Sequence, residues 1–326
     1  MSASTALAVG VTGASGFVGR AVCAALREQH HAIRPLLRRR HGGHPDESAL
    51  LVGEIGPDTD WRQALLGLDV VVHCAAHVHQ MGDGADTQAS AYQRVNTDGT
   101  LQLARCAALA GVRRLVFISS VKVLGESTLH GHPFRHDTPP APQDPYGQSK
   151  WAAEQGLWRM AAETGLEVVV IRPPLVYGQG VGANFAALIR LVRSGWPLPL
   201  GLINNRRSMV GLRNLVDLIC RCTTDTQAAG QTLLVSDGED LSTPDLVLRL
   251  AKAMGCRARI WRVPVAWMKL AGQLTGRSAQ IDRLTGSLQV DISRTCELLN
   301  WHPPHTVDEE LALAVGNAGH NKGIRP

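Results

Sequence analysis

The first half of the chain alternates short apolar runs with longer amphipathic stretches. A run without polar alternation, such as Val70-Val71-Val72, indicates a strand buried on both faces. We expect strands at residues 7–12, 32–37, 70–74, 115–119 and 168–171. Helical spacing of apolar positions predicts helices at residues 16–29, 92–110 and 146–164. Because strands and helices alternate, we predict a doubly wound parallel α/β sheet with right-handed crossovers.

The pattern changes after Pro173-Pro174. Residues 179–207 mix Gly, Pro and Asn around one predicted helix at 185–193. A helix at 215–223 and a strand at 232–235 follow, and this strand is placed to return to the sheet. Thr243 opens another helix, with Pro244 at its first position. The chain therefore divides into a sheet unit, residues 1–173 with about 209–235, and a smaller mixed α/β unit, residues 174–208 and 236–326.

Composition excludes several classes of protein. The 326 residues are 44% hydrophobic and 19% charged, as in a globular enzyme, and the net charge of +5 does not imply nucleic acid as a partner. No apolar run approaches the ~18 residues of a membrane-spanning helix, so no integral membrane segment is expected. The N-terminus has no basic stretch before its apolar residues, which favours a cytoplasmic location. Seven scattered cysteines without a CxxC pair indicate reduced thiols.

A glycine-rich turn lies between the first strand and the first helix, in the sequence VGVTGASGFVG. Gly13 suits a tight turn, Gly16 lets a phosphate approach the backbone, and Gly19 lets the helix pack closely on the sheet. The amide groups and the dipole at the helix N-terminus favour a pyrophosphate there. The sequence therefore predicts a dinucleotide site, and a turn that merely needs small residues is the alternative.

The end of the second strand bears on the form of the dinucleotide. An NAD site typically places an acid there to bind the ribose 2′-hydroxyl. In this chain Arg38-Arg39-Arg40 follow Leu37, and arginine binds a 2′-phosphate bidentately. NADP is therefore favoured, NAD remains possible, and a solvated basic loop is the alternative. Glu54 and Ile55 lie where a loop after the third strand flanks the adenine.

A tyrosine and a lysine are spaced for proton transfer. The chain has three tyrosines, and Tyr146 has Lys150 four residues later, behind an N-cap at Asp144. Residues i and i+4 share a helix face, so we expect the ammonium group to lower the phenol pKa and create a general acid or base. Ser120 ends a central strand, where such sheets bind ligands, and is placed to share the proton. The alternatives are an exposed helical pair and a hydroxyl that merely closes a strand.

Six motifs resemble the extended short-chain dehydrogenase/reductase superfamily, in particular its NAD-dependent epimerase/dehydratase family. They are TGASGFVG (12–19), HCAA (73–76), VNTDGT (95–100), FISSVKVLG (117–125), YGQSK (146–150) and IRPPLVYG (171–178). Residues 234–246 and 286–301 are similar to bacterial enzymes that reduce or epimerise nucleotide-linked hexoses for O-antigen and capsule, including UDP-glucose 4-epimerase-like proteins. The resemblance implies that the sheet unit is a Rossmann NAD(P)-binding domain and that the smaller unit binds a nucleotide sugar.

The resemblance also implies roles for individual residues. Tyr146 would be the acid/base, Lys150 would hold the nicotinamide ribose, and Ser120 would bind the sugar C4 oxygen. Asn96 would order the active-site helix, and Pro173 would begin the segment that borders the nicotinamide. Further cofactor contacts would be Ser15, Phe17, Val18, Ala75 and Ala76. Substrate contacts would be Lys122, Asn184, Arg207 and Arg283.

The chain departs from the family pattern at three places. Sugar 4,6-dehydratases typically have Asp and Glu after the active hydroxyl, whereas this chain has Val121 and Lys122, which disfavours dehydration. Leu124 stands where a tyrosine is usual. Asn214 stands where the epimerases have an acid.

These features leave three functions open. The favoured one is an NADPH-dependent 4-keto reductase of a UDP-linked, N-acetylated deoxyhexose in surface-polysaccharide synthesis. The second is an NAD-dependent UDP-sugar 4-epimerase, and either enzyme could accept a lipid-diphosphate sugar. The third is a non-catalytic NADP-sensing protein, which the Tyr–Lys pair disfavours. The resemblance implies a homodimer formed through the helices around Leu101 and Trp158.

Three histidines, His73, His77 and His79, are spaced like metal ligands. No carboxylate or thiolate completes the set, so we expect polar groups near the cofactor loop and no metal.

Overall fold

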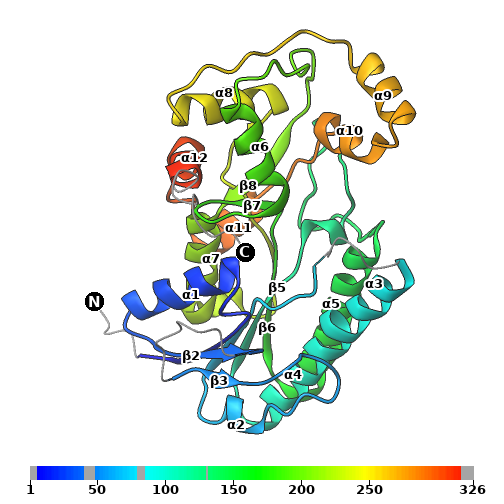
Figure 1. Ribbon diagram of the computed structural model, residues 1–326. Helices are drawn as coiled ribbons and strands as arrows, with labels where there is room; N and C mark the ends of the chain where they lie inside the picture. Colours follow the sequence, from blue (N-terminus) through cyan, green and yellow to red (C-terminus); the bar gives the residue numbers. More distant parts are fainter. Residues whose placement is uncertain (1–5, 40–47, 79–84, 130, 317–326) are drawn as a thin grey trace.

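A seven-stranded parallel sheet forms the larger body of the computed structural model, which describes residues 6–39, 48–78, 85–129 and 131–316 (Figure 1). Its strand order is β3-β2-β1-β4-β5-β6-β9, so the order reverses between β1 and β4. Ligands of such sheets bind beyond the strand ends at this reversal. The strands are β1 (Ala8–Thr12), β2 (Ala32–Leu37), β3 (Leu50–Leu51), β4 (Val70–His73), β5 (Arg114–Ile118), β6 (Glu167–Arg172) and β9 (Thr232–Leu234).

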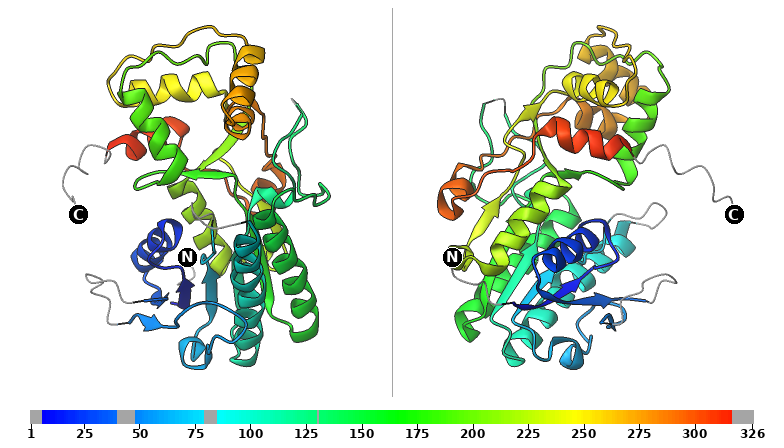
Figure 2. Two further views of the ribbon diagram at one scale, coloured as in Figure 1. Left: turned by 45° about the vertical axis from the view of Figure 1, so that its right-hand side comes forward. Right: turned by 90° about the vertical axis from the view of Figure 1, so that its left-hand side faces the viewer.

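Helices cover both faces of this sheet, as Figure 2 shows. On one face lie α1 (Phe17–Glu28) and α7 (Leu212–Thr224), and on the other lie α2 (Arg62–Leu65), α4 (Gly99–Leu109) and α5 (Pro145–Thr164). Val70 and Val72 pack into the first core and Val71 into the second. The apolar run is therefore buried on both sides, and the predicted doubly wound sheet is confirmed. The predicted return of residues 232–235 is also confirmed, because β9 pairs in parallel with β6.

The helix predicted at 92–110 is interrupted. A π-helical turn, η1 (Gln93–Asp98), separates α3 (Ala85–Tyr92) from α4. Two side chains of this turn bind α5: Asn96 Nδ2 lies 3.1 Å from Ser149 Oγ, and Thr97 Oγ1 donates to the Ser149 carbonyl at 2.9 Å. These tertiary hydrogen bonds accompany the wider turn, which regular helical spacing in the sequence does not reveal.

The second body is built around a three-stranded sheet in the order β10-β8-β7. The strands are β7 (Leu175–Tyr177), β8 (Arg207–Gly211) and β10 (Asp240–Leu241), and β10 is antiparallel to β8. The helices of the C-terminal part and of the segment after β7 are α6 (Ala183–Arg193), α8 (Thr243–Ala253), α9 (Val265–Leu274), α10 (Ser278–Thr285), α11 (Ser293–Leu299) and α12 (Val307–Gly316). Single 3₁₀ turns are η2 (Val121–Val123) and η3 (Thr226–Ala228).

The start of α8 is fixed by its sequence, as predicted. Ser242 and Asp245 form a reciprocal capping box, and Pro244 occupies the first turn. The buried face of α8 joins α6, α9 and α12 in a separate apolar core. In the part of the chain that the structure describes, no helix is both long and apolar enough to cross a bilayer.

Candidate active site

The glycine turn has the geometry that its sequence predicts. Gly13 has a φ of +64°, and a Cβ added there would lie 2.8 Å from the Ala75 nitrogen. A Cβ at Gly19 would overlap the Gly13 carbonyl. Gly16 caps α1, and no side chain of the described residues caps this helix end, so the first amides of α1 are available to an anion. Phe17 and Val18 form the first turn of α1, and Ser15 is exposed in the loop. The turn thus fits a dinucleotide pyrophosphate.

A carboxylate lies beside the arginines that follow β2. Glu54 contacts Arg39 at 3.1 Å and Arg38 at 3.6 Å. The side chain reaches them from the segment after β3, which pairs in parallel with β2. The acid that the sequence lacks at the end of the second strand is therefore supplied from elsewhere in the chain. Arg40 lies outside the described residues.

His73 joins the glycine turn to the π-helical turn. The Ala75 amide donates to Thr12 Oγ1 (3.2 Å), which bonds His73 Nδ1 (2.7 Å). On the other side His73 Nε2 lies 2.9 Å from Thr100 Oγ1, which donates to the Asn96 carbonyl at 2.7 Å. Since the Thr100 proton is committed to that carbonyl, Nε2 carries the ring proton and Nδ1 accepts from Thr12. Burial lowers the pKa of His73 to about 3, so the imidazole is neutral.

His73 is therefore a fully bonded polar group near the cofactor loop, as predicted. His77 binds Asn96 instead, through its backbone nitrogen (2.7 Å) and carbonyl (3.1 Å). His79 lies outside the described residues.

The N-terminal turns of α5 are held against the end of β5. Asp144 caps α5 by accepting from the Gly147 amide at 2.7 Å, as predicted. A Cβ on Gly147 would lie 2.8 Å from the Lys122 carbonyl, so α5 and η2 are in close contact. Ser120 caps η2, with its Oγ accepting from the Lys122 amide at 3.2 Å. The Pro173 carbonyl accepts from the Val121 amide at 3.0 Å and supports the same turn. The hydroxyl of Ser120 is thereby held beside the first turn of α5.

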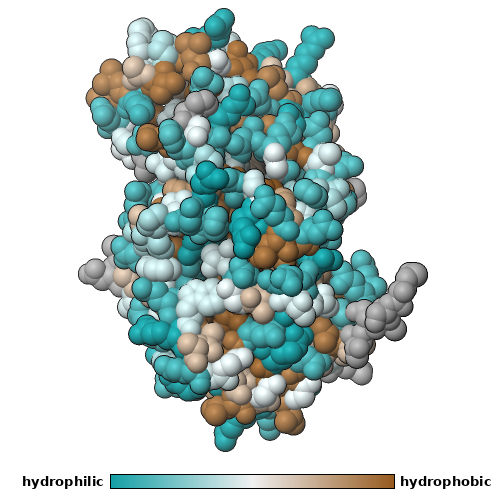
Figure 3. Space-filling view, turned by 180° about the vertical axis from the view of Figure 1, so that it is seen from behind, coloured by the Kyte–Doolittle hydropathy of each residue, from teal (hydrophilic) through white to brown (hydrophobic). Residues whose placement is uncertain are grey.

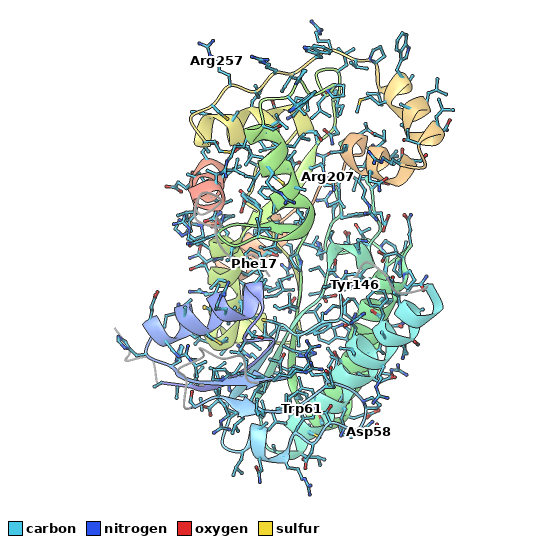
Figure 4. The ribbon with its side chains drawn as sticks, in the orientation of Figure 1. Phe17, Asp58, Trp61, Tyr146, Arg207 and Arg257 are labelled. Carbon is cyan, nitrogen blue, oxygen red and sulfur yellow. The ribbon has the colours of Figure 1, made fainter. Side chains whose placement is uncertain are left out.

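Tyr146 lies in that first turn, between the two bodies (Figure 4). Its ring is half-buried and meets the Tyr92 ring edge-on, 5.8 Å between centroids. The phenol oxygen has no hydrogen-bond partner among the described residues, which leaves it free for a ligand. The lowered pKa that we expected is wrong: burial raises the pKa of Tyr146, and the charges of Asp144 and Tyr92 raise it further.

The reason lies in the placement of Lys150. Its Nζ donates to the Ile118 carbonyl at 2.9 Å and lies 4.5 Å from the centre of the Phe117 ring. The side chain is buried, and this burial lowers the pKa of Lys150 to about 8. The ammonium group is thus bound at the end of β5, with its remaining N–H groups available to a ligand.

A buried ion pair next to Lys150 was missed by the sequence analysis. Glu154 accepts from Arg172 Nε at 3.1 Å and pairs with a second guanidinium nitrogen at 2.5 Å. It also accepts a short hydrogen bond from Ser119, the neighbour of Ser120. These bonds join α5, β5 and β6 directly beneath the site. The signal that could have found them is an acid at i+4 from Lys150 on a helix face that is otherwise apolar.

The predicted substrate contacts differ in their surroundings. Lys122 is engaged in ion pairs with Asp144 and, at 3.0 Å, Glu126. Arg207 donates to the carbonyls of Arg283 (2.8 Å) and Gly286 (3.1 Å). Burial and the neighbouring Arg283 lower the pKa of Arg207, which places two cations close together. Neither arginine has a carboxylate within salt-bridge distance among the described residues, a setting that fits an anion.

The side chain of Asn184 lies outside the described part of α6. Asn205 was missed: it is buried, and its Nδ2 donates to the carbonyls of Leu284 (3.2 Å) and Gly286 (2.9 Å). It therefore ties the start of β8 to the segment that carries Arg283.

The three departures from the family pattern also have structural explanations. Asn214 donates to Asp237 at 2.7 Å and bonds both backbone groups of His305. Asp237 additionally accepts from the Gly211 amide at 2.7 Å, so a carboxylate from another segment holds this loop. Leu124 packs in a small apolar core with Val121 and Leu234. Lys122 takes part in the ion pairs described above.

Comparisons with known proteins show the family of the chain. The model of the NAD dependent epimerase/dehydratase family matches residues 9–235. A UDP-glucose 4-epimerase of Vibrio cholerae is 47% identical over 302 residues, 92% of each chain. An N-acetyl-α-D-glucosaminyl-diphospho-ditrans,octacis-undecaprenol 4-epimerase of Escherichia coli O157:H7 is 27% identical over 92% of this chain and 91% of its own.

Among solved structures, the UDP-glucuronic acid 4-epimerase of Bacillus cereus in complex with NAD has a similar fold. The TM-score is 0.77, at 21% identity, over 96% of this chain and 98% of the other. The glycine turn, the Tyr–Lys pair and the family match over more than two thirds of the sequence all indicate the same family. The chain belongs to the NAD-dependent epimerase/dehydratase family of extended short-chain dehydrogenases/reductases, and it is an enzyme that uses a nicotinamide dinucleotide.

Proposed function

We propose that the protein is a 4-epimerase of a UDP-linked hexose. The sequence favoured a 4-keto reductase over a 4-epimerase, but the relative that is 47% identical over 92% of both chains is a UDP-glucose 4-epimerase, which supports the alternative instead. The observation that carries the chemistry is the unpartnered phenol oxygen of Tyr146 in the first turn of α5, which packs against η2, the turn that Ser120 caps, with Lys150 one helical turn further along α5.

The residues present fit a nicotinamide dinucleotide. A Cβ at Gly13 would fill the space between the turn and the Ala75 backbone. A Cβ at Gly19 would fill the space between the turn and the first turn of α1. The turn and the α1 amides would hold the pyrophosphate, with Ala75 and Ala76 bordering it, and Lys150 would bind the nicotinamide ribose. When bound, the dinucleotide supplies the acceptor and later the donor of the C4 hydride.

The chain's own residues handle the proton. Tyr146 removes the proton of the sugar C4 hydroxyl as C4 is oxidised, and returns a proton once the opposite face is reduced. Ser120 donates a hydrogen bond to the C4 oxygen in each state. In this structure the Lys150 ammonium group is held at the Ile118 carbonyl, and we propose that it stabilises the phenolate once the nicotinamide ribose is bound beside it. Because burial raises the pKa of Tyr146, this charge is needed for the base to form near neutral pH.

We propose NAD as the resident form of the dinucleotide. Glu54 pairs with both Arg38 and Arg39, offsets part of their positive charge and would supply the acid that accepts from a ribose 2′-hydroxyl. NADP, which the arginines alone favour, is the other outcome. Mass spectrometry of the cofactor released from the purified protein distinguishes the two forms.

We also propose the division of labour between the two bodies. Residues 1–173 and 212–235 bind the dinucleotide, and residues 174–211 and 236–326 bind the UDP moiety, with Arg207 and Arg283 at its diphosphate. We place the boundary after Gly211 rather than at about residue 209, as predicted from the sequence, because the whole of β8 pairs with β7 and β10. A homodimer through α4 and α5 stays a prediction, which sedimentation equilibrium tests.

The decisive experiment is conversion of UDP-glucose and of UDP-N-acetylglucosamine to their 4-epimers without added cofactor, followed by NMR. We expect interconversion, and a loss of about 10²–10⁴-fold in Tyr146→Phe. Tyr92→Phe is the matched control, since it removes the neighbouring phenol oxygen that raises the pKa of Tyr146, and it should keep activity within a few fold. Stoichiometric NADPH consumption with a UDP-4-keto sugar, and no epimerisation, would establish the reductase instead.

A further inference from the structure

One end of the second body gathers exposed aromatic side chains. Trp196, Trp261 and Trp267 are 70%, 62% and 72% exposed. The other four of the chain's seven tryptophans are buried or half-buried. A convex surface that holds every exposed tryptophan of a chain is unusual for a solvent-facing end. We call residues 196–202, 257–262 and α9 together the aromatic end.

Backbone pairing and helix geometry bring these side chains onto one surface. The Leu198 amide donates to the Arg259 carbonyl (2.7 Å), and the Trp261 amide to the Leu198 carbonyl (2.8 Å). Trp261 thus lies beside the segment that carries Trp196. In Figure 1 the connection from α8 to α9 runs along this end of the molecule.

The following helix continues the surface. Met268 and Gly272 form the buried face of α9, where Gly272 packs on Ile281 of α10. The spacing i, i+3, i+7 places its exposed apolar residues, Trp267, Leu270 and Leu274, on the outward face. Figure 3 shows hydrophobic surface at the same end of the molecule, at the upper left in the view from behind.

The same end is basic. The aromatic end holds Arg257, Arg259, Arg262 and Lys269 and no Asp or Glu, and Lys269 lies 3.7 Å from Asp282 of α10. Arg257, Arg259 and Arg262 are exposed, and within the described part of the chain none of them has a carboxylate within 4 Å. Figure 4 labels Arg257 at this end, well away from Tyr146. The positive charge is therefore available to a partner, and it lies outside the catalytic site.

Aromatic, leucine and arginine side chains on one convex end fit a particular partner. Tryptophan side chains prefer the headgroup level of a bilayer, and clustered Lys and Arg are attracted to anionic lipid. A nucleic acid would use the arginines but would leave Leu270 and Leu274 exposed. We propose that the aromatic end docks the enzyme peripherally on an anionic membrane surface, with the tryptophans among the headgroups and the arginines on lipid phosphates.

Co-sedimentation of the full chain with large unilamellar vesicles tests this proposal. One vesicle is pure phosphatidylcholine, and the other contains one quarter phosphatidylglycerol. We expect binding to the anionic vesicles at least tenfold stronger than to the neutral ones, because each lipid-facing cation contributes about fivefold. Binding should weaken as salt rises.

Two pairs of variants separate the contributions. Trp267→Ser/Leu274→Ser should reduce vesicle binding at least tenfold, whereas Leu66→Ser/Leu129→Ser, which removes two equally exposed leucines elsewhere, should not. Arg257→Glu/Arg259→Glu should abolish the preference for anionic lipid, whereas Arg94→Glu/Arg294→Glu should keep it. Circular dichroism and the epimerase assay verify that each variant is folded.

Three results overturn the proposal. The first is equally weak sedimentation with both kinds of vesicle. The second is an equal loss of vesicle binding in the test variants and their controls. The third is concentration-dependent self-association that Trp267→Ser/Leu274→Ser abolishes, without any vesicle binding. The last would make the aromatic end an interface between copies of the chain. Vesicle binding does not depend on the epimerase proposal, so the two fail separately.

Discussion

At the scale of single residues, His73 links the cofactor turn to the catalytic helix. Its two ring nitrogens bond Thr12 of β1 and Thr100 of α4. Thr100 in turn bonds the carbonyl of Asn96, whose side chain bonds Ser149 of α5. A neutral imidazole with one proton lets every hydrogen bond in this chain have one donor and one acceptor. A second proton on the ring would make Nδ1 a donor that faces the hydroxyl proton of Thr12.

We therefore predict that His73 makes stability depend on pH. Its pKa is lowered to about 3 in the folded state, so below pH ~6.5 the unfolded chain binds a proton that the folded one does not. Stability is then lost as pH falls, by about 2 kcal/mol between pH 6.5 and 5. Urea unfolding at several pH values should show this slope in the wild type and in exposed His302→Gln. His73→Gln should lack it, and an identical slope in His73→Gln would refute the assignment.

Glu54 carries a second prediction at this scale. Glu54→Gln removes the carboxylate that contacts Arg38 and Arg39, so both guanidinium groups become available to a 2′-phosphate. We expect the affinity ratio of NADP to NAD to rise about tenfold, the strength of one charge-assisted bond. Fluorescence titration of apoprotein with both cofactors measures it. Glu28→Gln, at the far end of α1, is the control, and an unchanged ratio in Glu54→Gln would place the 2′ site elsewhere.

The sequence predicted the residue chemistry unevenly. The turn glycines, the Asp144 cap and the bonded state of His73 follow from local spacing and residue type, and the structure bears them out. The acid at the end of β2 and the carboxylate that binds Asn214 come from segments distant in sequence, so spacing gave no sign of them. The prediction of a lowered pKa for the Tyr146 phenol was wrong, because that pKa depends on where the Lys150 ammonium group is bound.

At the scale of elements, α5 is the part that positions the proposed catalytic groups. One end is fixed by the Asp144 cap and the contact of Gly147 with η2. Two turns further, Glu154 ties the helix to Arg172 of β6 and to Ser119, the residue directly after β5. The π-helical turn binds the same helix from the other side through Asn96 and Thr97. Regular periodicity predicted these helices, but not the turn that joins them.

Breaking the buried pair should therefore affect both stability and catalysis. Glu154→Ala leaves a buried guanidinium without its partner, and we expect a loss of about 3–5 kcal/mol in the free energy of unfolding. Glu163→Ala, on the exposed face of α5, should change it by less than about 0.5 kcal/mol. Urea unfolding gives both values. A loss below about 1 kcal/mol in Glu154→Ala would show that the pair does not hold α5 in place.

At the scale of the whole molecule, the two bodies present different chemistry to one another. The larger body offers the α1 amides, Tyr146 and Lys150, and the smaller body offers Arg207 and Arg283. The sheet of the larger body was predictable, because long apolar strands have an unmistakable pattern. The sheet of the smaller body was not, because β7, β8 and β10 are three, five and two residues long and are held by distant segments.

This arrangement predicts that the affinities for UDP and for NAD can be lowered independently. Arg283→Gln should reduce UDP affinity about tenfold or more, because it removes a charged donor from the diphosphate, and should leave NAD affinity unchanged. Arg206→Gln is the matched control, since this exposed neighbour of Arg207 carries the same charge without an assigned role. Isothermal titration calorimetry with UDP and with NAD measures all four effects. Equal losses in Arg283→Gln and Arg206→Gln would indicate a general field of positive charge, whereas a loss of NAD affinity in Arg283→Gln would mean that the smaller body also forms part of the cofactor site.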